Sequence, residues 1–117
     1  MAGDMKRIST HVLDVSLGRP AAKLPVRLER QGQSGNWQQL QSACTDNDGR
    51  CAQLLPADHL PPGVYRLVFE TENYFAALQV EGLYPLVEVT FHVREGASHF
   101  HIPLLLSPNG YTTYRGS

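Results

Sequence analysis

Two histidines near the end of the chain, His99 and His101, are separated by one residue. Because successive side chains of a β-strand point to opposite faces, a strand over 99–106 would place both imidazoles on one face. The other face would carry the apolar residues Phe100, Ile102, Leu104 and Leu106. An imidazole titrates near pH 6.5 and can therefore accept or donate a proton at neutral pH. This face predicts either acid–base chemistry or metal binding.

A third histidine, His11, alternates with the apolar Ile8 and Val12 and is therefore expected on the outer face of a strand that begins at residue 7. Considered alone, an outer-face histidine is more typical of a solvated surface than of a site. With His99 and His101 it would also suit a three-histidine zinc site, in which His11 or His92 supplies the third ligand. The residue types alone leave the metal and the acid–base interpretations open.

Arg50 follows the polar segment Thr45-Asp46-Asn47-Asp48-Gly49. Asp46-x-Asp48-Gly49 resembles the middle of a calcium loop, but Leu55 stands where that loop would close with Glu, and no helix pair flanks it. A tight turn explains the same residues, because Asp and Asn side chains bond their own backbone and Gly supplies a positive φ. The turn would direct Arg50 outward at the start of a short strand over 51–55. A guanidinium offers a fixed fork of donors for a polar or anionic ligand.

The segment Ser107-Pro108-Asn109-Gly110 predicts a turn, since Pro presets a negative φ and Asn-Gly tolerates a positive one. The chain would then return as a strand over 111–117, which ends Tyr114-Arg115-Gly116-Ser117. Chain ends usually fray. A closing hairpin rich in His, Tyr and Arg therefore suggests that the terminus belongs to a site.

Composition limits the class of protein. A chain of 117 residues is expected to form one domain, and its 42% hydrophobic and 18% charged content is ordinary for a soluble globular protein. The net charge of -1 argues against a nucleic-acid partner, which requires a basic surface. No apolar stretch approaches the length of a signal peptide core or a membrane span. We therefore expect no membrane association and a cytoplasmic location, or a periplasmic one if a signal peptide was removed from a longer precursor.

The two cysteines, Cys44 and Cys51, flank the polar turn and could face each other across a hairpin. Two cysteines in a chain of this size do not make the disulfide framework of a secreted domain. Reduced structural thiols are the favoured interpretation.

About eight short strands, with turns every several residues, predict an all-β sandwich over residues 7–117 after a disordered lead-in at 1–6. The only helical candidate is residues 72–79, where Tyr74, Phe75 and Leu78 recur with helical spacing. Leu104-Leu105-Leu106 is apolar on both faces of its strand, and Leu13 shares a face with His11. A sheet that is apolar on both faces must be covered. A second copy of the chain is the expected cover.

Five segments carry a resemblance to a known family. They are Ser9-Thr10-His11-Val12-Leu13-Asp14, Thr45-Asp46-Asn47-Asp48-Gly49-Arg50, Gly63-Val64-Tyr65-Arg66-Leu67 with Tyr74-Phe75, the run His99–Pro108 and the terminal Tyr114-Arg115-Gly116-Ser117. Together they resemble the transthyretin-like 5-hydroxyisourate hydrolases. The resemblance implies a sandwich of two four-stranded sheets with one short helix. It also implies a homotetramer, a dimer of dimers with active sites at the interface between dimers.

The resemblance further implies an enzyme of urate and purine degradation. The reaction would be hydrolysis of 5-hydroxyisourate to 2-oxo-4-hydroxy-4-carboxy-5-ureidoimidazoline, without a metal or other cofactor. The catalytic residues would be His11, Arg50 and His101, and the substrate-binding residues would be His11, Arg50, Tyr114, Arg115 and Ser117. Which histidine acts as the general base stays open. The alternative from another class is a transthyretin-like carrier that binds a small ligand without catalysis, since a fold alone does not give function.

Overall fold

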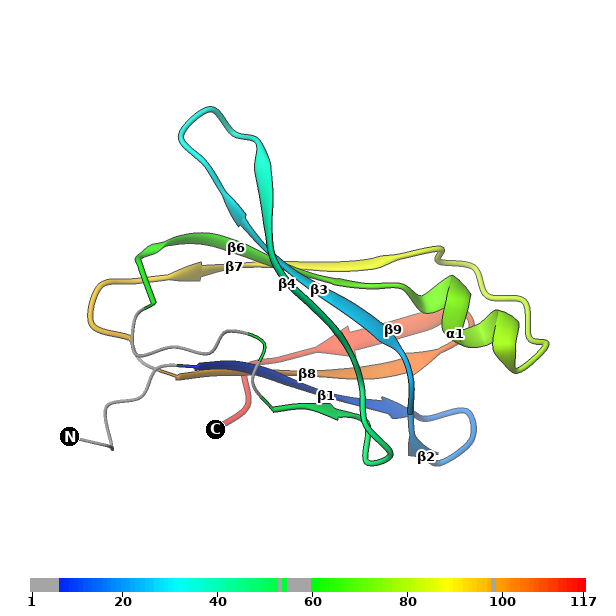
Figure 1. Ribbon diagram of the computed structural model, residues 1–117. Coiled ribbons are helices and arrows are strands. Elements are labelled where there is room, and N and C mark those ends of the chain that lie inside the picture. Colours follow the sequence, from blue (N-terminus) through cyan, green and yellow to red (C-terminus); the bar gives the residue numbers. More distant parts are fainter. Residues whose placement is uncertain (1–6, 53, 55–59, 98) are drawn as a thin grey trace.

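Two β-sheets packed face to face form the computed structural model, which describes residues 7–52, 54, 60–97 and 99–117 (Figure 1). The first sheet contains β1 (Arg7–Asp14), β2 (Arg19–Pro20), β5 (Arg50–Cys51), β8 (His99–Ser107) and β9 (Gly110–Thr113). The second has the order β4-β3-β6-β7, with β3 (Pro25–Gln31), β4 (Trp37–Cys44), β6 (Gly63–Phe69) and β7 (Val87–Val93). The predicted all-β sandwich is confirmed.

The first sheet has five strands, where the resemblance implied four. The extra strand arises because two strands of two residues each share one edge of β1. β5 pairs with Thr10 and His11, and β2 pairs with Leu13 and Asp14. The core of that sheet still consists of β1, β8 and β9, and the second sheet has the four strands expected.

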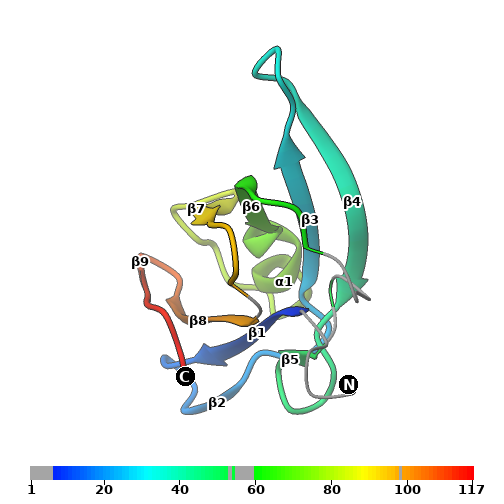
Figure 2. The same cartoon turned by 90° about the vertical axis from the view of Figure 1, so that its left-hand side faces the viewer.

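The apolar core is built from buried side chains of both sheets, and Figure 2 shows how the two sheets face each other. The predicted inner face of β8 is buried throughout: Phe100, Ile102, Leu104 and Leu106 are each at most 6% exposed. Ile8 and Val12 on β1 are fully buried. The alternation of side chains on both strands is therefore as the sequence predicted, and the histidines lie on the outer side.

β1 and β8 lie side by side in parallel, although 92 residues separate the paired positions. Their register runs without a break from Arg7 opposite His99 to Asp14 opposite Leu106. The buried hydroxyl of Thr10 adds a hydrogen bond of 2.5 Å to the carbonyl of Ile102. This pairing fixes the relative positions of side chains on the outer face of the sheet.

The helix α1 (Thr71–Ala77) lies at the opposite end of the sandwich from the C-terminus (Figure 1). Tyr74 and Phe75 are buried, and the Tyr74 hydroxyl donates a 2.7 Å hydrogen bond to Oδ2 of Asp14 at the end of β1. The helix was expected to continue to residue 79. It ends sooner because Gln79 adopts a left-handed φ of 59°, which an α-helix does not accommodate. No helix in the described part of the chain is long and apolar enough to cross a membrane.

The two cysteines lie in different sheets and are free. Cys44 is exposed on β4, whereas Cys51 is buried on β5, where burial raises the pKa of its thiol to about 11. The two residues do not face each other across a hairpin. That both thiols are reduced stays a prediction.

Candidate active site

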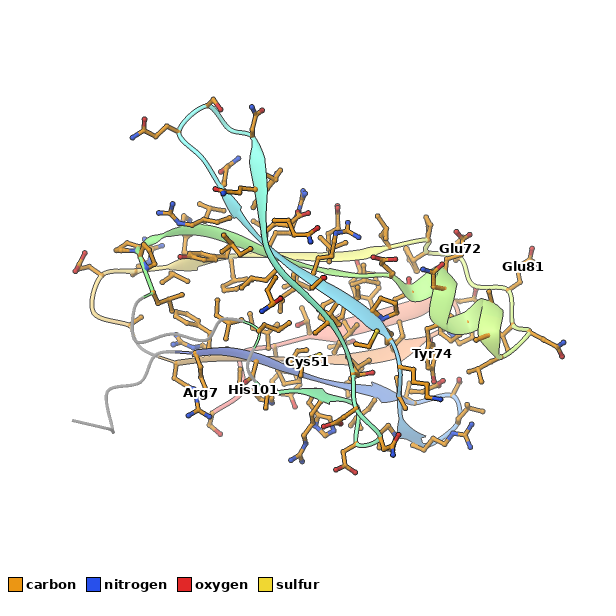
Figure 3. The ribbon with its side chains drawn as sticks, in the orientation of Figure 1. Arg7, Cys51, Glu72, Tyr74, Glu81 and His101 are labelled. Atoms are coloured by element: carbon orange, nitrogen blue, oxygen red, sulfur yellow. The ribbon has the colours of Figure 1, made fainter. Side chains whose placement is uncertain are left out.

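The parallel pairing of β1 with β8 brings polar side chains together on the outer face of the first sheet. Ser9 is in register with His101, and Arg7 is in register with His99. Directly paired residues of neighbouring strands point to the same face of a sheet, so these four side chains share one surface. Arg7 and His101 lie at the end of the sandwich away from α1 (Figure 3).

β5 brings Arg50 directly opposite His11 on β1. The preceding turn is built as the sequence predicted: Oδ1 of Asp46 accepts hydrogen bonds of 2.9 Å from the backbone amides of Asp48 and Arg50. Gly49 has a φ of +78°, and a side chain there would collide with the carbonyl oxygen of Val12. The turn therefore presses against β1, and the amide of Val12 donates a 2.7 Å hydrogen bond to the carbonyl of Gly49.

The C-terminal tail continues beside β8 after β9 ends at Thr113, earlier than the predicted strand over 111–117. The amide of Gly116 donates a 2.7 Å hydrogen bond to the carbonyl of His101. This contact places Ser117 beside the histidine face. The turn at Pro108 and Asn109, which the sequence did predict, sets the hairpin that makes the return possible.

These residues surround an open hollow of about 330 Å³. Its described lining residues are Arg7, Ser9, Thr10, His11, Arg50, Ala52, His99, His101 and Ser117. Of the predicted site residues, the structure thus brings together His11, Arg50, His101 and Ser117. The lining includes two guanidinium groups and no carboxylate side chain. The hollow is suited to a polar ligand that carries or develops negative charge.

The surroundings of His101 shift the pKa of its imidazole. Burial lowers the pKa of His101 from its ordinary value of 6.5, and the positive charges of His11, His99 and Arg50 lower it further. The ring is therefore neutral at pH 7 and has a free nitrogen lone pair. A neutral imidazole beside a guanidinium can take a proton from water while the guanidinium binds negative charge.

Tyr114 and Arg115 do not line this hollow in the single chain. They border a second, less polar hollow of about 240 Å³, together with residues of β7 and β8 that include His92 and Phe100. The guanidinium of Arg115 stacks over the Phe100 ring, 4.6 Å from its centroid. The substrate-binding roles of these two residues stay predictions.

Ser9 and Arg7 are lining residues that the sequence did not single out. The alternation of β1 was a signal for Ser9, because it puts Ser9 on the same face as His11. The proximity of Ser9 to His101 could not be predicted from the sequence, because it depends on the pairing of β1 with β8.

The metal interpretation requires side chains that converge on one point. Within the described ranges, no group of three or more His, Cys, Asp or Glu side chains could hold a metal ion. His92, one suggested third ligand, lies on β7 in the other sheet.

The structure is a two-sheet β-sandwich with a hollow lined by histidine and arginine side chains on one outer face. A family model described as the HIUase/Transthyretin family matches residues 8–116, and the chain belongs to this family.

Several relatives resemble the chain over nearly all of its length. A 5-hydroxyisourate hydrolase of Mus musculus is 45% identical over 118 aligned positions, which cover 100% of each chain. The solved structure of a Klebsiella pneumoniae 5-hydroxyisourate hydrolase has a TM-score of 0.85 and 39% identity, and the match covers 97% of this chain and 100% of that one. Sea bream transthyretin, solved in complex with thyroxine, has a TM-score of 0.88 and 31% identity, with 93% of each chain covered. The fold is thus shared by hydrolases and a thyroxine-bound transthyretin.

Proposed function

We infer that this chain hydrolyses 5-hydroxyisourate in urate degradation. The observation that carries this function is the gathering of His11, Arg50, His101 and Ser117 around one hollow, from three strands and the tail. Relatives that match the whole chain have the same activity in their names. The product would be 2-oxo-4-hydroxy-4-carboxy-5-ureidoimidazoline.

The reaction is the opening of a cyclic amide by water. Water adds to a ring carbonyl carbon and loses a proton, and the carbonyl oxygen becomes an oxyanion. The carbon–nitrogen bond then breaks, the departing nitrogen takes up a proton, and a carboxylic acid remains. The chemistry needs a base for the water, donors for the oxyanion and a proton for the leaving nitrogen.

The lining residues can be assigned to these tasks. In our proposal, His101 and His11 orient the water and move the proton, because both rings border the hollow and that of His101 is neutral at pH 7. Arg50 holds the planar, polar substrate and stabilises the oxyanion with its fork of donors. Ser117 adds a hydrogen-bonding group at the rim.

We also propose that the active form is a homotetramer, a dimer of dimers with the hollow at the interface between dimers. Leu13 and Leu105 lie in register on the outer face that carries the hollow, and both are only partly buried. Directly after β1, Val15 and Leu17 are 54% and 50% exposed. Solvent-accessible apolar side chains on this face and directly after β1 favour coverage by a second copy.

Sedimentation of the purified protein tests the tetramer. We expect the wild-type chain to sediment as a tetramer and Leu105→Glu to sediment as a smaller species. Gln38→Glu, which adds the same charge on exposed β4, serves as the control and should stay tetrameric. A wild-type monomer at micromolar concentration would contradict the assembly.

The enzymatic activity is tested by generating 5-hydroxyisourate from urate in situ and following its ultraviolet absorbance. We expect the protein to accelerate the decay far beyond the spontaneous rate at a substoichiometric concentration. A carrier would instead bind the compound without turnover, and its effect would saturate at one equivalent per site. Decay at the spontaneous rate would therefore overturn the hydrolase and favour the carrier.

A further inference from the structure

The imidazole of His101 is held from two sides by residues that have no assigned role. On one side, Oγ of Ser9 lies 2.9 Å from Nδ1 of the ring. Ser9 is only 7% exposed, and its position is fixed by the β1–β8 register, in which it is paired with His101. This hydrogen bond therefore occupies Nδ1 at a defined point on the strand.

On the other side lies the backbone of Gly116. A Cβ at this position would stand 2.6 Å from Cδ2 and 3.3 Å from Cγ of the His101 ring. The backbone of Gly116 does not lie in the left-handed region, so the lack of a side chain is required by space and not by backbone conformation. The hydrogen bond from its amide to the His101 carbonyl keeps the two backbones together.

The consequence for the ring is a single orientation. With Nδ1 bonded to Ser9, Nε2 is the nitrogen left for a ligand, and the described residues supply no hydrogen-bond partner for it. A serine hydroxyl can donate to or accept from an imidazole nitrogen, so the bond to Ser9 fixes which way the ring faces and not which nitrogen carries the proton. A base that acts through Nε2 requires Nδ1 to carry the proton and to donate it to Oγ of Ser9. In metal sites, a hydrogen bond to the second nitrogen of a histidine holds the ring in one orientation. The Ser9 hydroxyl can hold His101 in the same way.

We propose that Ser9 and Gly116 are positioning residues that clamp the His101 imidazole in one orientation, with Nε2 toward the hollow and the proton on Nδ1. The catalytic value of the clamp rests on the proposed hydrolase function, but the clamp itself is a property of the ring and can be measured without substrate. It also gives a reason for the glycine in the terminal Tyr-Arg-Gly-Ser, because any larger residue would displace the ring.

The test combines ring spectroscopy with kinetics on the full-length protein. ¹⁵N NMR of the histidine rings, with His101 assigned by a His101→Gln variant, should show one donor-type and one acceptor-type nitrogen in the wild type above the pKa. Ser9→Ala should shift both nitrogens toward averaged values and lower kcat by ~10–100-fold. KM should stay within about threefold, because Arg50, the proposed substrate-binding group, is untouched. Ser9→Thr keeps the hydroxyl and should restore the single tautomer.

Gly116→Ala tests the other side of the clamp. We expect altered ring shifts of His101 and a fall in kcat of ~10–100-fold. Gly110→Ala, in the same hairpin, is the matched control, because its Cβ would meet only the Ser107 hydroxyl oxygen at 3.8 Å. Thermal melting of each variant separates loss of positioning from loss of folding.

Two patterns of results distinguish a failure of the clamp from a failure of the proposed hydrolase function. A wild type that shows a single tautomer but does not accelerate 5-hydroxyisourate decay would overturn the proposed function and leave the clamp standing. An active wild type whose Ser9→Ala and Gly116→Ala variants keep the wild-type ring shifts and kcat would overturn the clamp.

Discussion

The hydrogen bond from Tyr74 to Asp14 connects α1 to the end of β1, and its removal has a calculable cost. Asp14 is fully buried, and Tyr74 is the only described donor to its Oδ2. Its Oδ1 accepts from Ser16 and Leu17.

Tyr74→Phe keeps the ring and leaves Oδ2 without a donor. A hydrogen bond to a charged group is worth ~1.5–3 kcal/mol. With an unfolding entropy of ~2.1 cal/mol/K per residue, or about 0.25 kcal/mol/K for 117 residues, the loss lowers Tm by about 6–12 °C.

Differential scanning calorimetry at equal protein concentration measures this shift. Tyr84→Phe is the matched control, because Tyr84 lies at the surface and its ring contacts Tyr111 edge-on; its Tm should change by less than about 2 °C. Burial and the Asp14 hydrogen bond raise the pKa of Tyr74. Because the folded-state pKa of Tyr74 is raised, the stability that this group contributes is fully present below its unfolded-state pKa near 10. That stability is lost as the pH rises from there through the folded-state pKa. Equal Tm values for both variants would refute the reasoning.

Three further predictions concern the reaction. Arg50→Gln should lower kcat/KM by ~10²–10³-fold if Arg50 stabilises the oxyanion, whereas the exposed Arg94→Gln should have no effect; equal rates for the two would contradict the assignment. Because the pKa of His101 lies below 6.5, kcat/KM should fall as pH drops with a midpoint below 6.5, and a midpoint above that value would exclude His101 as the group responsible. Chelation with EDTA should leave turnover unchanged, and a loss that zinc restores would revive the metal interpretation.

The faces of individual strands were predictable because the alternation of apolar and polar side chains depends only on local geometry. That is why the outer positions of His11 and His101 and the inner position of Phe100 followed from the sequence. The turn before Arg50 was predictable for a similar reason, since Asp46 and Gly49 act within a few residues of each other.

The pairing of strands was not predictable from the same patterns. Nothing local in β1 indicates that it lies parallel to β8, and the contact between Ser9 and His101 depends on that pairing. The position of the Arg115 side chain was not predictable either, because its guanidinium stacks on the Phe100 ring in a cation–π contact between distant residues. The helix end at Ala77 was missed because Gln79 adopts a backbone conformation that its residue type does not favour.

The fold is shared with a transthyretin that was solved in complex with thyroxine, so the fold alone does not give the function. The strands supply a rigid register, and His11, Arg50 and His101 supply the proposed chemistry. Rigid elements hold such groups more accurately than loops do. Ser117 is the exception, since it is carried by the tail that follows β9.

The most direct measurement is the decay of 5-hydroxyisourate with wild-type protein, with His101→Asn and with His92→Asn. His92 lies on β7 and borders the other hollow, so it controls for the loss of a histidine. Wild type and His92→Asn should accelerate the decay equally, and His101→Asn should be slower by ~10²–10⁴-fold. No acceleration by the wild type, or equal rates for His101→Asn and wild type, would contradict the central claim.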